Sequence, residues 1–401
     1  MRNVVLLTIN GADHAGVTAA FTTVLSRYDI NILDVGQSVI HDRLNLGMLL
    51  EVADIDNTSV HEDLLKLANQ QSLTISFTPV DESEYEQWVQ SEGKPRYIVT
   101  MLGRKLSADN IGHLSAVAAK HDMNIDSITR LSGRFSLSDD NRHKRACVEF
   151  SMRGKPADEE QLRTDLLAIT QEDDVDVAFQ ADDVFRRHRR LVVFDMDSTL
   201  IQCEVIDELA KAAGTGEEVM AITEAAMRGD IPFNESFERR PATLEGLSED
   251  ILIDIANNLP ITEGADRLIF TLKKLGYKVG ILSGGFSYFA NRLKDRWELD
   301  FVAANELDIS DGKLTGKVKG EIVNGEKKAE YLRQMAAEFN IDMKQTVAVG
   351  DGANDLPMLA IAGLGIAFHA KPLVRESARH SISSLGLDGI LYLLGVRDRE
   401  V

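Results

Sequence analysis

Two carboxylates one residue apart follow directly on a short apolar run. Asp195 and Asp197 come after residues 191–194, whose four apolar side chains predict a buried strand. Open α/β sheets bind ligands outside the carboxyl ends of such strands. A carboxylate at that edge can attack phosphorus because it is ionised at neutral pH, and a second carboxylate can move the proton. The pair predicts a nucleophile at Asp195 and a general acid and base at Asp197, with environments that separate their pKa values.

A second acidic cluster lies far downstream in the same setting. Asp351, Asn354 and Asp355 follow the apolar run 346–349. Two strands that each deliver carboxylates to one edge of a sheet can hold a hard cation that prefers oxygen, such as Mg²⁺. The neighbouring Gly350 and Gly352 allow a tight backbone turn around the ion. The two clusters together predict a phosphoryl-transfer site that uses Mg²⁺.

Two further segments offer groups that suit a phosphate. Ser283 and Gly284 follow the apolar run 279–282, so a hydroxyl and a backbone amide can donate to phosphate oxygens. Ser283 can equally serve as the N-cap of a helix. Lys328 can neutralise negative charge on the phosphoryl group, and its neighbour Lys327 is the competing candidate.

The elements that position these residues belong to an α/β architecture. From residue 191 onward, apolar strands alternate with helical patterns, which predicts a Rossmann-like parallel sheet with helices on both faces. A helix-rich insert at about 206–259 contains no strand pattern and is placed to cap the sheet edge. We expect this catalytic domain to span 188–401.

The first 180 residues contain a duplicated unit. Gly11 and Gly103 lie 92 positions apart, and Asn31 and Asn124 lie 93 apart, so the copies match with a one-residue slip. Each copy predicts strand, helix, strand, strand, helix, strand, an α+β sandwich of the ferredoxin-like kind. A polar, acidic stretch at 81–86 separates the copies. We therefore expect domains at 1–80 and 95–182.

In order and type these residues resemble the four motifs of haloacid-dehalogenase-type phosphatases, and the duplicated units resemble tandem ACT domains, which are small amino-acid-sensing modules. The motifs that carry the resemblance are Asp195-Met-Asp197-Ser-Thr, Ser283-Gly-Gly, Lys328 and Gly350-Asp351-Gly-Ala-Asn354-Asp355. The resemblance implies an aspartyl-phosphate intermediate. It also implies Mg²⁺ ligands from the Asp195 side chain, the Asp197 carbonyl and the Asp351 side chain, with Asp355 supporting from behind and Asn354 near the substrate.

The insert is similar to that of the phosphoserine phosphatases within this family. Glu204 can bind an ammonium group, and Arg240 suits a carboxylate because its guanidinium is planar and bidentate. The resemblance implies hydrolysis of O-phospho-L-serine to L-serine, the last step of serine biosynthesis. Met227 and Phe233 line the apolar side of this pocket or are ordinary cap core. Pro241 is expected to break the helix beside Arg240, which makes Arg239 a rival.

The ACT resemblance implies a regulatory site where two units meet. The loop after the first strand of each copy is polar and bears glycine, and such a loop can present backbone amides to a carboxylate. We expect the product serine to bind near Asp13, Gly16 and Gly103 and to lower activity. The alternative is that the units serve only to form a homodimer.

The overall composition of the chain limits the classes of partner that it can bind. The formal net charge is -20, which disfavours nucleic acid and anionic membranes. The densest basic run, 186–190, is expected to be a solvated linker. Two cysteines make no disulfide framework, and no long apolar run or signal peptide is visible. We expect a cytoplasmic protein.

Two other functions stay open on sequence grounds. One is a phosphatase or phosphotransferase for another small phosphate ester, such as phosphothreonine. The other is an amino-acid-sensing regulator on an inactive scaffold. Intact Asp195, Asp197, Lys328 and Asp351 argue against the second.

Overall fold

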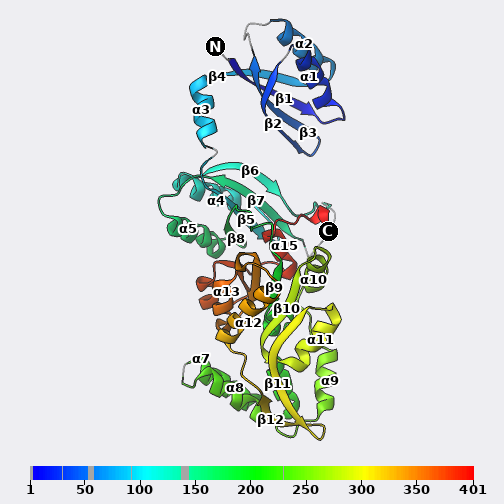
Figure 1. The fold of residues 1–401 in the computed structure, drawn as a ribbon, viewed down its shortest axis with the longest axis vertical. Coiled ribbons are helices and arrows are strands. Elements are labelled where there is room, and N and C mark those ends of the chain that lie inside the picture. The colour runs from blue at the N-terminus through cyan, green and yellow to red at the C-terminus, as the bar shows by residue number, and fades with distance from the viewer. Residues whose placement is uncertain (1–2, 29, 53–57, 92, 137–143, 229) are drawn as a thin grey trace. The chain divides into compact units, whose positions relative to one another are not determined.

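A computed structural model describes residues 3–28, 30–52, 58–91, 93–136, 144–228 and 230–401. The chain forms two compact units, Met1–Lys94 and Pro95–Val401, and each is described by itself (Figure 1). Within the described ranges, every helix is too short or too polar to cross a membrane.

The first unit is an α+β sandwich. Its four strands pair antiparallel in the order β2-β3-β1-β4, and two helices cover one face. The elements are β1 (Asn3–Ala12), α1 (Val17–Leu25), β2 (Asn31–Ile40), β3 (Arg43–Val52), α2 (Thr58–Gln70) and β4 (Thr74–Val80). The predicted order of elements is confirmed. The acidic stretch that follows is helix α3 (Glu82–Ser91), which the sequence reading missed; Glu82 and Glu84 suit its positive N-terminal end.

The second unit begins with the second copy of this sandwich. Its strands pair in the order β6-β7-β5-β8, which repeats the first sheet position for position. The elements are β5 (Arg96–Gly103), α4 (Ala108–Lys120), β6 (Asn124–Arg130), β7 (Ala146–Arg153), α5 (Glu159–Glu172) and β8 (Asp176–Ala181).

A seven-stranded sheet fills the rest of this unit. The order is β12-β11-β10-β9-β13-β14-β15, and all neighbours are parallel except the β11–β12 hairpin. The strands are β9 (Leu191–Phe194), β10 (Lys278–Phe286), β11 (Phe301–Ser310), β12 (Lys313–Lys319), β13 (Thr346–Gly350), β14 (Leu364–Phe368) and β15 (His380–Ile382). The predicted parallel sheet is therefore confirmed, with an antiparallel edge strand added.

Side chains alternate between two cores, one on each face of the sheet. Along β9, Val192 and Phe194 join one core, while Leu191 and Val193 join the other. The first core lies under α10 (Ala265–Lys274) and α11 (Ser287–Trp297), and the second under α12 (Gly325–Glu338) and α13 (Leu356–Ile361) (Figure 1). Burial on both faces explains why these strands are apolar throughout instead of alternating.

The first four α-helices after β9 make up the helix-rich insert, which we call the cap. They are α6 (Val205–Ala213), α7 (Gly216–Met227), α8 (Phe233–Ala242) and α9 (Glu249–Asn257). The expectation that Pro241 breaks the helix is wrong, because α8 continues through it to Ala242. Only one helical residue follows the proline, so the missing N–H and the ring disturb the end of α8 and leave its body intact.

The basic run 186–190 is not a solvated linker throughout. Arg186 is buried and pairs with Glu149 of β7, and Arg189 is also buried. Arg187 and Arg190 are exposed. The spacing of three between the buried arginines puts them on one side of a turn against the protein, a pattern that charge alone does not reveal.

Asp176 fastens the second sandwich to the catalytic part of the same unit. Its carboxylate accepts hydrogen bonds from the backbone N–H of Ser383 (2.9 Å) and from the N–H and hydroxyl of Ser384 (2.8 and 2.6 Å). The side chain is almost fully buried, and this burial raises its pKa while the three donors oppose the rise. Nearby, the Gln180 amide donates to the Leu393 carbonyl at 3.1 Å.

We expect Asp176→Ala to destabilise the second unit, because three donors lose their acceptor. Leaving buried donors unpaired costs about 1–3 kcal/mol, which should appear as a lower melting temperature by calorimetry or differential scanning fluorimetry. Asp176→Asn keeps one acceptor oxygen and should lose less. Asp182→Ala, at an exposed position just beyond β8, is the control. A melting temperature unchanged in Asp176→Ala would contradict this anchoring role.

Candidate active site

The carboxyl ends of three neighbouring strands build the site. β9 lies between β10 and β13, with Phe194 in register with Ile281 on one side and Val349 on the other. Phe194, Ile281 and Val349 therefore lie at the same level of the sheet, and the backbone N–H of Asp195 still bonds to the Val349 carbonyl at 2.8 Å. The polar residues delivered to this edge are Asp195, Asp197, Ser283, Asp351, Asn354 and Asp355.

A buried lysine lies between two of these carboxylates. Lys328, in the first turn of α12, places its Nζ 2.9 Å from Asp195 Oδ2 and 2.7 Å from Asp355 Oδ1. Burial alone would lower the pKa of Lys328, but the charges of Asp195 and Asp355 reverse this and hold it above its usual value. Lys327 instead bonds to Glu321 and Glu330 at the surface. The geometry thus selects Lys328 over its neighbour.

Asp197 and Asp195 lie in different surroundings. Asp195 is held by the Met196 backbone N–H (2.7 Å) and by Lys328. Burial raises the pKa of Asp197 well above its usual range, and the charges of Glu204 and Asp195 add to the rise. Asp197 Oδ1 accepts a hydrogen bond from the Val205 N–H at 3.1 Å. Asp195 therefore lies beside a cation, whereas Asp197 is favoured in the protonated form.

Three carboxylates converge closely enough to share a cation. One oxygen from each of Asp195, Asp351 and Asp355 lies within 4.8 Å of the others. Burial and the neighbouring carboxylates raise the pKa of Asp351 to about 8 and that of Asp355 to about 7. A divalent cation would offset this repulsion.

Both carboxylate oxygens of Asp355 already have partners within the protein. Its Oδ1 is taken by Lys328 and its Oδ2 by the Gly352 N–H at 3.0 Å. Both oxygens of Asp195 also have partners, the Met196 N–H and Lys328, so these contacts alone do not distinguish which carboxylates would bind an ion. The oxygen-only donor set fits a hard cation.

The last residues of β10 hold a hydroxyl and backbone amides close to Asp197. Ser283 is fully buried, and its Oγ accepts from the Gly285 N–H at 2.9 Å, which leaves its hydrogen available to another acceptor. A Cβ placed on Gly284 would lie 3.6 Å from the Asn354 amide nitrogen, so Asn354 borders the same space. The Asn305 amide donates to the Gly284 carbonyl at 2.9 Å and fixes this segment from behind.

Glu204 and Arg240 face the site from the cap. The Ser198 hydroxyl donates to Glu204 Oε1 at 2.7 Å. Glu204 keeps an exposed edge, yet the loss of water around its carboxylate raises its pKa, and the charge of Arg240 opposes the rise. Arg240 is partly buried, and its Nε has no hydrogen-bond partner within the described part of the chain. Arg239 pairs with Glu235 along α8.

The remaining predicted residues lie at element ends. Met227 ends α7 and Phe233 begins α8, but their side chains lie outside the described residues. In the first unit, Gly16 is the N-cap of α1 with φ 96°, and that helix end has no side-chain cap. The backbone N–H of Asp13 bonds to the Asp42 carbonyl at 2.7 Å.

The second copy differs at the corresponding loop. The N-terminus of α4 is closed by its own capping box, in which Ser107 and Asn110 bond to each other's backbone N–H. Gly103 is packed tightly, because a Cβ there would lie 3.1 Å from the Asp174 carbonyl and 3.2 Å from Val175 Cγ1. The two copies of the predicted effector loop are therefore not equivalent.

Comparison with known proteins identifies each part of the chain. Residues 189–363 match the haloacid dehalogenase-like hydrolase family, and residues 3–78 and 96–180 each match an ACT domain family. A protein of Mycobacterium tuberculosis named phosphoserine phosphatase SerB2 is 40% identical over 99% of this chain and 94% of its own length. The chain belongs to the haloacid dehalogenase-like hydrolases.

Other relatives of this hydrolase agree in sequence and in fold. A phosphoserine phosphatase of Archaeoglobus fulgidus is 39% identical and covers 86% of this chain and 95% of its own. The crystal structure of a probable phosphoserine phosphatase from Vibrio cholerae is 35% identical, covers 75% of this chain and 86% of its own, and superposes with a TM-score of 0.57.

Several supporting residues of this hydrolase escaped the sequence reading. Ser198 holds Glu204, Thr199 donates to Asp351 at 3.3 Å, and Asn305 braces the last residues of β10. Ser198 and Thr199 lie inside the first motif, so their position was a usable signal. Asn305 lies within β11, and no sequence signal indicated its role, because only the packing of two strands brings it to the site.

Gly285, next to the last residue of β10, allows a test of the contact with Asp197. A Cβ on Gly285 would lie 2.2 Å from Asp197 Oδ2, whereas one on Gly284 meets nothing closer than 3.5 Å. We expect Gly285→Ala to displace Asp197 and lower kcat by about 10²-fold or more, the scale of general acid–base catalysis. Gly112→Ala, at a glycine of α4 where an added Cβ would meet nothing within 4 Å, is the control and should leave kcat near the wild-type value. Rates on para-nitrophenyl phosphate measure both, and equal losses would mean that the contact with Asp197 is not what matters.

Proposed function

We propose that this protein is a phosphoserine phosphatase, which hydrolyses O-phospho-L-serine to L-serine and phosphate as the last step of serine biosynthesis. The observation that carries the proposal is the placement of Glu204 and Arg240, one anion and one cation from the cap, beside the buried cluster of Asp195, Lys328 and Asp351. The names of the full-length relatives support the same substrate.

Asp195 is the nucleophile in this proposal. Its oxygen forms a bond to phosphorus while the bond from phosphorus to the serine oxygen breaks, and Asp197 gives that oxygen a proton. Water then attacks the aspartyl-phosphate, Asp197 takes a proton from it, and phosphate leaves with Asp195 restored. The raised pKa of Asp197 supports this role, because a carboxyl must be protonated at neutral pH to act as the first acid.

The phosphate is held by groups that donate to its oxygens. Lys328 neutralises charge that develops on the phosphoryl group, and the Ser283 hydroxyl and the Gly284 N–H donate hydrogen bonds. Asn354 borders the same space. Lys328 is already in contact with Asp195, so its charge is in place before the substrate arrives.

Mg²⁺ is the proposed cofactor. Asp195 and Asp351 would offer carboxylate oxygens and Asp197 its backbone carbonyl, with Asp355 holding Lys328 and the Gly352 turn. The ion would supply positive charge that allows a dianionic phosphate to approach several carboxylates. The raised pKa values of Asp351 and Asp355 support the need for such a charge.

The cap reads the amino-acid part of the substrate. Glu204 binds the ammonium group, and Arg240 binds the carboxylate with its unpaired Nε and its terminal nitrogens. Met227 and Phe233 are assigned to the apolar side of the pocket from the sequence alone.

The ACT units give the enzyme a regulatory or assembly role in this proposal. Serine would bind near Asp13 and Gly16, where the uncapped N-terminus of α1 offers backbone amides to a carboxylate. Gly103 was predicted to take part, but its tight packing gives it less support. Exposed apolar side chains on the edge strand β2, namely Ile32, Val35, Val39 and Ile40, support a homodimer, which sedimentation equilibrium would test.

Phosphate release by the purified protein tests these assignments together. We expect phosphoserine to be hydrolysed far faster than phosphothreonine or para-nitrophenyl phosphate, activity to disappear with a chelator and return with Mg²⁺, and added serine to lower the rate. Equal turnover of all three esters would discard the substrate assignment and keep the chemistry. Full activity after chelation would discard the metal.

Variants of the cap residues separate recognition from chemistry. Glu204→Gln or Arg240→Ala should lower kcat/KM for phosphoserine by about 10²-fold, since each removes a charge-assisted contact worth roughly 1.5–3 kcal/mol. The same variants should change para-nitrophenyl phosphate hydrolysis little. Arg239→Ala, one position away on the exposed side of α8, is the control. Equal losses on both substrates would show that the two residues do not read the amino acid.

A further inference from the structure

The cap is joined to the catalytic core by two short linkers that pair with each other. The incoming linker, residues 200–203, follows the Asp195–Asp197 turn directly, and the outgoing linker spans residues 260–263. The Gln202 N–H donates to the Pro260 carbonyl (2.8 Å) and the Thr262 N–H to the Leu200 carbonyl (3.0 Å). Ile201 and Ile261 form an antiparallel bridge between these bonds. We call this pair of linkers the cap hinge.

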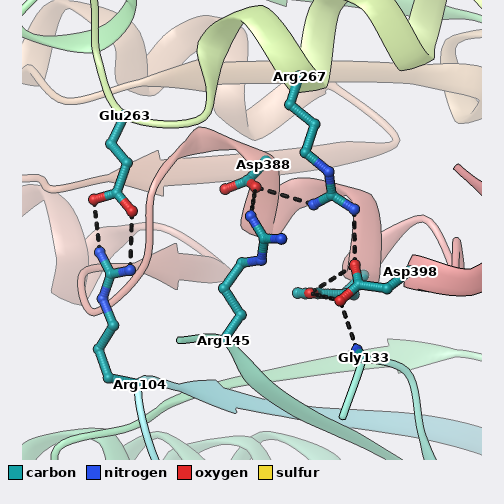
Figure 2. A network of polar contacts seen from close by, with 8 residues as sticks. Arg104, Gly133, Arg145, Glu263, Arg267, Asp388 and Asp398 are labelled. Atoms are coloured by element: carbon teal, nitrogen blue, oxygen red, sulfur yellow. Dashed lines mark hydrogen bonds and ion pairs between the residues drawn. The ribbon is translucent and has the colours of Figure 1, made fainter. Parts of the chain in front are cut away.

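The outgoing linker is fixed at Glu263 by two contacts. Its carbonyl accepts from the Leu387 N–H at 2.8 Å. Its carboxylate receives both terminal nitrogens of Arg104, at 2.9 and 2.7 Å (Figure 2). Arg104 belongs to the second ACT unit and directly follows β5. A bidentate pair of this kind fixes orientation as well as distance.

Buried contacts hold the base of Arg104. Gly103 packs closely against Asp174 and Val175, and the Leu102 carbonyl accepts from the Ser384 hydroxyl at 3.4 Å. Asp176, on the strand beside β5, binds the same Ser384. Arg104 therefore starts from a rigid part of the second ACT unit, and little ordering is needed when it meets Glu263.

A second arginine of the same ACT unit braces the end of the hinge. Arg145 bonds to Asp388, which also receives Arg267 of α10 at 3.0 Å (Figure 2). Asp388 packs so closely on Gly264 that a Cβ there would lie 2.4 Å from its carboxylate oxygen. Gly264 has φ 81° and is the residue that follows the hinge. Two ACT arginines thus meet the hinge where it joins the core.

The hinge lies beside the groups that act on the substrate. Glu263 lines a cavity of about 220 Å³ together with Ser198 and Gln202. Ser198 in turn holds Glu204. A shift of the outgoing linker therefore reaches the incoming linker, the Ser198 turn and the cap residue assigned to the ammonium group.

We propose that the second ACT unit forms the fixed base of the cap hinge, and that Arg104 is a positioning residue that acts through Glu263 on cap closure over the substrate. This rests on the proposed function only for the identity of the substrate. The pair is about one-third exposed on each side, 34% for Arg104 and 39% for Glu263, so its contribution to stability is small. Its effect is on where the cap closes.

Steady-state kinetics of the full chain test the proposal. Arg104→Gln and Glu263→Gln should each raise KM for phosphoserine on the order of three- to tenfold, within the range of coupling between packed sites. The double variant should lose no more than either single variant, and the charge swap Arg104→Glu with Glu263→Arg should recover part of the loss. Hydrolysis of para-nitrophenyl phosphate should stay near the wild-type rate. The control is Arg96→Gln, which breaks an ion pair with Asp126 inside the second ACT unit.

Hydrogen–deuterium exchange supplies a readout that does not depend on the substrate. Peptides covering 200–203 and 260–264 should exchange faster in Arg104→Gln and Glu263→Gln than in the wild type or in Arg96→Gln. Unchanged exchange with unchanged KM, or additive single effects without recovery in the swap, would overturn the proposal. A wild type that does not prefer phosphoserine would refute the proposed function, and the exchange result would still decide the hinge.

Discussion

The catalytic part of this protein depends on one buried arrangement of charge, in which Lys328 lies between Asp195 and Asp355 with no solvent contact. A buried ion is costly unless it is paired and hydrogen-bonded. The surroundings meet that requirement: Met196 N–H binds Asp195, and Gly352 N–H binds Asp355. With only one lysine among several carboxylates, the balance stays negative. A divalent cation would add positive charge to this cluster and offset the repulsion between its carboxylates.

The close packing of these carboxylates requires glycine at neighbouring positions. Gly350 leaves room for the Asp355 carboxyl, since a Cβ there would lie 2.4 Å from it, and Gly285 does the same for Asp197. Both glycines have ordinary backbone angles, so they are required by space and not by conformation. Where a side chain would fit, as at Gly284, the free volume faces Asn354 and the proposed phosphate position. Gly350 and Gly285 therefore leave the space that Asp355 and Asp197 need to keep their positions.

The sequence predicted the parts of this site that one strand end can deliver. Asp195, Ser283 and Asp351 each follow an apolar run, and parallel strands bring such ends together whatever lies between them. It did not predict contacts that depend on two elements packing at a particular distance. Asn305 braces the site from a strand with no motif, and the burial of Arg186 depends on Glu149 of the second sandwich. The prediction at Pro241 was wrong because the rule that proline breaks a helix says little about a last helical turn that the rest of the cap holds in place.

The two ACT copies show how a repeat can keep its fold and change its use. Gly11 packs against Leu73, the residue before β4, as Gly103 packs against Val175, the residue before β8. The glycine shared by the copies therefore serves packing inside each sandwich, and by itself does not indicate a ligand. The next residue differs: Ala12 in the first copy and Arg104 in the second. In the second copy the loop predicted to bind an effector carries the arginine that reaches Glu263, and its helix end is already capped. The first copy keeps an uncapped helix N-terminus, and the second copy is bonded to the catalytic part. Binding of an effector and transmission of its effect to the catalytic part would therefore belong to different copies.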